Sequence, residues 1–140
     1  MTVQDHQPAI GLKRVLKSVL AVLAGFITVA ALSTLTDIPL HILGIYPPEG
    51  EPMFEPGLNI LALSYRIAFT ILGGYVTARL APSNPMTHVL VLGGIGLVMG
   101  SLGAMVSMNA NLGPDWYPIA LVVTAVPAVW LGGWVHQKTL

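Results

Sequence analysis

The chain has no cysteine, which excludes disulfide bonds, thiolate metal sites and cysteine nucleophiles. Charged residues are also scarce. They make up 9% of the 140 residues, whereas a soluble domain carries roughly 25%. The histidines are scattered and lack the spacing that a zinc site on a helix needs; they are His6, His41, His88 and His136. We therefore expect no enzyme activity, no metal, no cofactor and no nucleic-acid partner.

Long apolar runs account for the low charge. They are Ser18–Thr36, Gly57–Ala78, Val89–Ser107 and Trp116–Val135. About 20 apolar residues cross the hydrocarbon core of a bilayer as a helix. The sequence therefore predicts an all-α fold, a four-helix transmembrane bundle that forms one membrane domain over residues 13–140. We expect a cytoplasmic tail at 1–12, followed by helices at about 13–37, 59–80, 86–108 and 115–136.

The first apolar run has an alternative interpretation as a cleaved signal peptide. Lys13, Arg14 and Lys17 would then form its basic region. The run is longer than the ~7–15 apolar residues of a typical signal peptide. Its length favours a helix that stays in the protein.

The placement of lysine and arginine predicts the orientation in the membrane. These residues precede the first run, close the second and follow the fourth, and all three places lie on one side if the helices alternate. The opposite side has no lysine or arginine and carries Asp37, Glu49, Glu51, Glu55 and Asp115. Because cytoplasmic loops are enriched in lysine and arginine, we expect both termini in the cytoplasm.

An eight-residue motif occurs twice, as LGGYVTAR at Leu72–Arg79 and as LGGWVHQK at Leu131–Lys138. A weaker similarity links VLAGF at Val22–Phe26 with VLGGI at Val91–Ile95. The simplest explanation is a duplicated two-helix hairpin, giving two parallel repeats about an axis along the membrane normal. Convergence is the alternative, because paired glycines allow close packing and an aromatic residue near a base is common at membrane interfaces.

Small residues recur every four positions on the second, third and fourth predicted helices. In lipid no hydrophobic drive joins helices, so small residues that let backbones approach closely are typical of their contacts. This pattern and the two Gly-Gly pairs predict where the helices pack. The expected packing residues are Gly73, Gly74, Gly96, Gly100, Ala104, Gly132 and Gly133.

Arg66 is a charged residue inside a predicted span. A charge at the bilayer centre costs about 2.5 kcal/mol or more, and less near the interface. At ~1.5 Å per residue, Arg66 lies roughly 10 Å below the outer end of its helix, within reach of Asp37. The sequence predicts an intramembrane polar cluster there, with Asn59 also capping the second helix. The cluster comprises Arg66, Asp37, His41, Asn59, Ser64 and Tyr65.

Three roles for Arg66 stay open at this point. It can pair with Asp37 and lock the first two helices together. It can form an anion or substrate site in a small transporter or channel. It can also contact a lipid headgroup or a partner protein. An intramembrane charge favours a functional role, whereas an acidic partner at a similar depth favours the structural one.

The segment GGYVTARLAP at 73–82 is followed by a short proline-containing turn and a glycine-rich third helix. This combination resembles small, uncharacterised bacterial inner-membrane proteins, over about half of the chain. The resemblance implies a multi-pass protein of the bacterial inner membrane and implies no activity.

The expected function is therefore that of a non-catalytic integral membrane protein. It would act as an accessory or assembly subunit of a larger membrane complex, or as a self-associating helical bundle. The alternative is a small transporter or channel that uses Arg66 as an anion or substrate site. The expected partners are membrane lipids and other membrane subunits or further copies of the chain.

Overall fold

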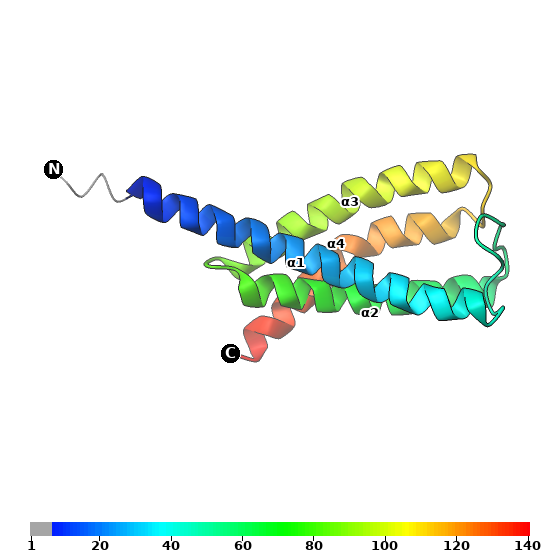
Figure 1. Ribbon diagram of the computed structural model, residues 1–140, viewed down its shortest axis with the longest axis horizontal. Helices are drawn as coiled ribbons and strands as arrows, with labels where there is room; N and C mark the ends of the chain where they lie inside the picture. Colours follow the sequence, from blue (N-terminus) through cyan, green and yellow to red (C-terminus); the bar gives the residue numbers. More distant parts are fainter. Residues whose placement is uncertain (1–6) are drawn as a thin grey trace.

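Residues 7–140, the part of the chain that this computed structural model describes, form four helices and no strand (Figure 1). The helices are α1 (Gln7–Ile42), α2 (Pro56–Leu80), α3 (Pro85–Asn109) and α4 (Trp116–Lys138). Each is long and apolar enough to cross a membrane. The predicted all-α, four-helix membrane fold is confirmed, and it fits a multi-pass integral membrane protein. Residues 1–6 of the predicted tail, with His6, lie outside the described residues.

Helix α1 is longer than predicted at both ends. It begins at Gln7 rather than about Lys13, and it continues through Asp37 and Pro39 to Ile42. The Leu43 amide still donates to the Pro39 carbonyl at 2.9 Å. Gly44 then turns the chain with φ +75°, a conformation that glycine adopts without steric cost. The helix therefore ends at Ile42, just before this turn, and not at Asp37.

Glu55, not Asn59, caps the start of α2, so the predicted Asn59 cap is wrong. The carboxylate of Glu55 accepts hydrogen bonds from the amides of Gly57 and Leu58, each at 3.0 Å. Pro56 occupies the first helical position, where its missing amide hydrogen has no helical partner to lose. The helix thus begins one turn before Asn59, and the Asn59 side chain is free for another role.

Helix α2 is central, because it packs against all three other helices. Helix α4 packs against α2 and α3, and within residues 7–140 its backbone does not come close to that of α1. The N-terminal start of α1, the α2–α3 turn and the C-terminus lie toward one side of the molecule in Figure 1, which we call the terminal end. The α1–α2 loop (43–55) and the α3–α4 loop (110–115) lie together at the opposite side, which we call the loop end.

The first Gly-Gly pair of the repeated motif lets α2 approach two neighbours. A Cβ on Gly73 would lie 2.9 Å from the carbonyl oxygen of Gly25 on α1, and one on Gly74 would lie 2.8 Å from the Cα of Val129 on α4. Both distances are shorter than van der Waals contact allows. Glycine is therefore required at these two crossings, where α2 touches α1 on one side and α4 on the other.

The second Gly-Gly pair does the same for α4. A Cβ on Gly132 would lie 2.6 Å from the amide nitrogen of Tyr75 on α2, and one on Gly133 would lie 3.1 Å from side-chain atoms at the start of α3. The two copies of the motif thus pack against each other where α2 and α4 cross. Close packing therefore explains all four glycines without any duplication. The duplication of a hairpin stays a prediction.

The predicted packing residues on α3 make looser contacts. A Cβ on Gly96 would lie 3.8 Å from the Cβ of Ala125, and one on Gly100 would lie 3.4 Å from Val122. Ala104, one turn further on, is half-exposed. A cluster of buried apolar residues lies instead nearer the start of α3, and its members are Ala78, Val89, Leu92 and Val129.

Candidate functional site

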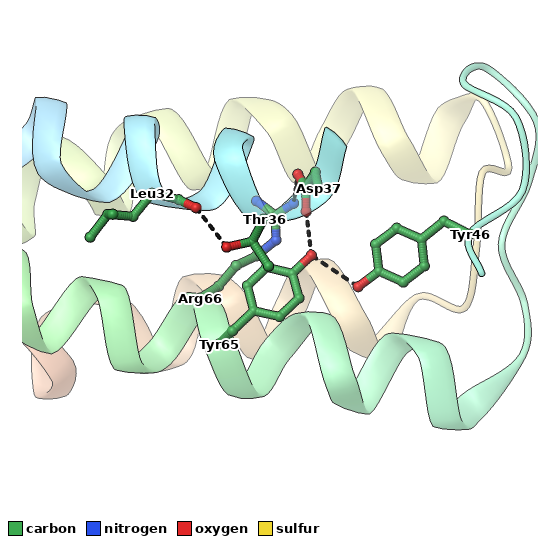
Figure 2. Close-up of polar contacts among 6 residues, drawn as sticks. All are labelled: Leu32, Thr36, Asp37, Tyr46, Tyr65 and Arg66. Carbon is green, nitrogen blue, oxygen red and sulfur yellow. Dashed lines mark hydrogen bonds and ion pairs between the residues drawn. The ribbon is translucent and has the colours of Figure 1, made fainter. Parts of the chain in front are cut away.

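An ion pair joins α1 to α2 near the loop end. Nη2 of Arg66 lies 2.5 Å from Oδ2 of Asp37. The side chain of Arg66 is 30% exposed and that of Asp37 is 23% exposed, so both are mostly buried within the protein. A charge-assisted hydrogen bond of this kind is roughly twice as strong as one between neutral groups. Figure 2 shows Arg66 pointing from α2 toward Asp37 on α1.

Two tyrosines extend this ion pair. The Tyr65 hydroxyl donates to Oδ1 of Asp37, so each carboxylate oxygen has its own donor. The Tyr46 hydroxyl lies 2.9 Å from that of Tyr65. Because the Tyr65 proton points to the carboxylate, Tyr46 donates to the Tyr65 oxygen. The result is a chain of hydrogen bonds that runs from the loop to Asp37 (Figure 2).

Tyr46 belongs to the α1–α2 loop and is only 4% exposed. Burial raises the pKa of its hydroxyl, so the hydroxyl keeps the proton that it donates to Tyr65. His41 holds the same loop, since its Nδ1 lies 2.8 Å from the carbonyl oxygen of Pro47. A carbonyl can only accept, so Nδ1 carries a proton. The His41 ring also meets the Tyr46 ring edge-on, with centroids 5.4 Å apart.

Asn59 stands apart from the ion pair and fixes the loops. It is 2% exposed, and its Nδ2 donates to the carbonyl oxygens of Met53 and Glu55, each at 3.0 Å. The Met53 amide in turn donates to the carbonyl of Leu112 at 2.7 Å. Asn59 therefore ties the α1–α2 loop to α2, and Met53 ties it to the α3–α4 loop.

Ser64 is not brought into the polar cluster. Its side chain is exposed, and its hydroxyl donates to the carbonyl oxygen of Ile60 in its own helix at 2.7 Å. Ser64 precedes Tyr65 and Arg66 directly, and successive residues point about 100° apart around a helix. The serine thus shares their depth but lies on another face of α2. Of the six predicted cluster residues, the structure joins three by direct contact, namely Asp37, Tyr65 and Arg66.

Arg66 lies between two partly open pockets. On one side, a pocket of about 200 Å³ lies beneath the α1–α2 loop and is lined by Asp37, Tyr46 and Tyr117 as well as Arg66. On the other side, a cavity of about 310 Å³ is lined by all four helices, with Ser33, Thr70 and Thr124 among its polar residues. Arg66 lines both spaces. Its Nε is buried and has no hydrogen-bond partner within residues 7–140.

Comparison with protein-family models, with curated proteins and with solved structures finds no match for this chain. The ion pair has no net charge, and the tyrosines that surround it are neutral donors and acceptors. Such a network can hold two helices together, or it can open when a ligand replaces Asp37 as the partner of Arg66. Among the described residues, no group of His, Asp and Glu side chains could hold a metal ion.

Two residues of this region were not predicted as members of the cluster. The sequence indicates only that Tyr46 and Tyr117 belong to an aromatic belt at the membrane surface. Tyr46 lies 19 residues before its partner Tyr65, and Tyr117 comes from another helix, so no local spacing links either to Arg66. The one signal in the sequence is that both tyrosines lie close to helix ends at the same side of the bundle: Tyr46 follows the end of α1, and Tyr117 lies at the start of α4.

Proposed function

We propose that this chain is a non-catalytic integral membrane protein that acts by association within the membrane. It would serve as an accessory or assembly subunit of a larger membrane complex, or as a self-associating bundle. The observation that carries the proposal is the pairing of Arg66 with Asp37 inside the chain. The charge that is most costly in a membrane is thereby used to join two helices, which supports a structural role.

The shape of the bundle supports association as well. The loop-end half of α3 packs loosely and leaves a run of apolar side chains exposed, among them Leu97, Val98, Leu102, Met105 and Val106. Methionine-rich helical surfaces adapt readily to different partners. In an assembly, this half of α3 is the natural position for a neighbouring subunit or a second copy.

We further propose a location in the bacterial inner membrane with both termini in the cytoplasm. Lys13, Arg14, Lys17, Arg79 and Lys138 all belong to the terminal end, and lysine and arginine are enriched on the cytoplasmic side of membrane proteins. The resemblance of the GGYVTARLAP segment to bacterial inner-membrane proteins supports the same location.

The mass of the purified protein in a mild detergent tests this function. We expect light scattering to report either an oligomer of the chain or a complex with a second membrane protein in fixed stoichiometry. Two differently tagged copies expressed together should co-purify in the first case and not in the second. A monomer with no stoichiometric partner would contradict the proposal.

A second candidate function is that of a small transporter or channel. It is favoured by the position of Arg66 between the loop pocket and the cavity inside the bundle. The test is chloride efflux from phosphatidylcholine vesicles that contain the purified protein, with Arg66→Gln as the variant. Efflux that depends on Arg66 would support this candidate. Equal efflux from protein-free vesicles and vesicles with the wild type would exclude chloride conduction.

A further inference from the structure

Helices α1 and α3 meet near the terminal end and then diverge. Oγ of Ser18 lies 2.7 Å from Nε2 of His88. Nδ1 of His88 lies 3.0 Å from the carbonyl oxygen of Asn84, which can only accept, so Nδ1 carries the proton and Ser18 donates to Nε2. Beyond this contact the two helices separate toward the loop end (Figure 1).

The space that opens between them is an apolar groove of about 510 Å³. Val22 and Phe26 form its α1 wall, and Val91, Ile95 and Met99 form its α3 wall. Among the described residues that line it there is no glycine or alanine, although helices that pack in membranes meet at such small residues. The backbone of a second helix cannot approach such walls closely, whereas a flexible acyl chain can fill the uneven space between them.

Charge at the foot of the groove indicates the class of lipid. Within residues 7–140, all the Lys, Arg, Asp and Glu residues of the terminal end are basic; they are Lys13, Arg14, Lys17, Arg79 and Lys138. Arg14 is exposed and lies four residues before Ser18, which itself lies four before Val22. Residues four apart share one face of a helix. Arg14 therefore continues the groove wall outward, by about 6 Å from Ser18.

We propose that the α1–α3 groove binds an anionic phospholipid. One acyl chain lies between the walls formed by Val22, Phe26 and Ile95, and the phosphate lies beside Arg14. The Ser18–His88 pair closes the foot of the groove at the level where the glycerol esters meet the headgroup. Arginine is suited to the phosphate because its guanidinium can donate two parallel hydrogen bonds. This site goes beyond the proposed function and does not depend on it.

Native mass spectrometry of the full chain in a mild detergent tests the headgroup. We expect the wild type to retain one phosphatidylglycerol in preference to phosphatidylcholine with the same chains. Arg14→Gln should reduce this preference about fivefold, the change that ~1 kcal/mol per basic residue near an anionic surface produces. Lys13→Gln removes the same charge but lies about 140° around α1 from Ser18, so it should keep the preference. Equal retention of the two lipids, or equal loss in the two variants, would overturn the proposal.

A second pair of variants tests the groove itself. Ile95→Trp places an indole in the groove and should lower retention of the lipid. Leu90→Trp is the matched control, because Leu90 is also exposed on α3, at 46% against 38% for Ile95, and does not line the groove. Both variants should melt near the wild-type temperature, since both side chains face outward. If Ile95→Trp leaves lipid retention unchanged, no acyl chain occupies the groove. The same conclusion follows if Ile95→Trp, and not the control, disrupts a dimer.

Discussion

Arg66 and Asp37 form an ion pair between two helices. The carboxylate accepts one hydrogen bond from Arg66 and one from Tyr65, so two helices and one loop depend on it. Breaking a largely buried ion pair from one side leaves an unpaired charge, which costs several times more than the net worth of the intact pair. The consequences of mutation should therefore depend strongly on which partner is removed.

Arg66→Ala should destabilise the protein more than Asp37→Asn. The first change leaves a carboxylate with only the Tyr65 donor, whereas the second leaves a guanidinium that can extend toward the membrane surface. The double mutant should cost less than the sum of the two single mutants, with a coupling of about 0.5–3 kcal/mol. Melting curves of the wild type, both single mutants and the double mutant in detergent measure this coupling.

The result separates the structural role of Arg66 from the functional one. Strictly additive shifts would contradict the pairing as a source of stability. If Arg66→Ala melted like the wild type while assembly or chloride efflux failed, the residue would serve a partner or a ligand. Tyr65→Phe is a useful companion variant, because it removes one donor to Asp37 and keeps the ion pair.

The position of a residue along a helix can be predicted from sequence more easily than the face of the helix on which its side chain lies. Counting ~1.5 Å per residue along two helices brings Asp37 and Arg66 within reach, and the structure joins them by an ion pair. The same count includes Ser64, which lies on another face of α2 and bonds only to its own helix. Tyr46 cannot be placed by such a count, because it lies in a loop and the path of a loop has no regular period.

Whole helices approach each other most closely where glycine residues lie between them. Gly74 faces the backbone of α4 and Gly132 faces the backbone of α2, so the central crossing has no side chain between its two helices. Such close approach replaces the hydrophobic drive that lipid does not provide. The α2–α4 crossing should be the most sensitive contact in the molecule, and the open side of α3 the least.

Gly74→Ala should destabilise the bundle, by about 1–3 kcal/mol, the usual cost of overpacking. Its new methyl group would meet backbone atoms of Val129, which cannot rotate away. Gly94→Ala is the matched control, since nothing lies within 4 Å of a Cβ at Gly94. That variant should be neutral or stabilising by about 0.5–1 kcal/mol, because alanine is the better helix former. Melting temperatures in detergent compare the two, and equal destabilisation would contradict the packing described for α2 and α4.

Helix number and type follow from the apolar runs, but helix ends do not. The uncharged run that contains most of α1 stops at Asp37, yet the helix continues to Ile42, because backbone hydrogen bonds persist through a charged residue. Glu55 caps α2 four residues before the predicted cap at Asn59. Hydrophobicity thus locates the part of a helix that fits the membrane, and local hydrogen bonding decides where the helix ends.

The whole molecule has a charge asymmetry that its net charge of zero conceals. The loop end carries Glu49, Glu51, Glu55 and Asp115, and the terminal end carries the lysines and all the arginines except Arg66. Arg66, the one lysine or arginine near the loop end among residues 7–140, is neutralised by Asp37. Among residues 7–140 the separation of acidic from basic residues is therefore nearly complete, and it favours a single orientation in the membrane.

That orientation can be measured, because the chain has no cysteine of its own. Single cysteines at Glu51, in the α1–α2 loop, and at Ser83, in the α2–α3 turn, lie at opposite ends of the molecule (Figure 1). In intact bacterial cells an impermeant thiol reagent should label Glu51→Cys and leave Ser83→Cys unlabelled. Glu51 is preferable to its neighbour Gly50, whose φ of +85° would strain any side chain. Ser83→Cys must react once the cells are opened, which shows that its thiol is accessible. Labelling of Ser83→Cys alone in intact cells would reverse the proposed orientation, and equal labelling of both would contradict a bundle whose two ends lie on opposite sides of the membrane.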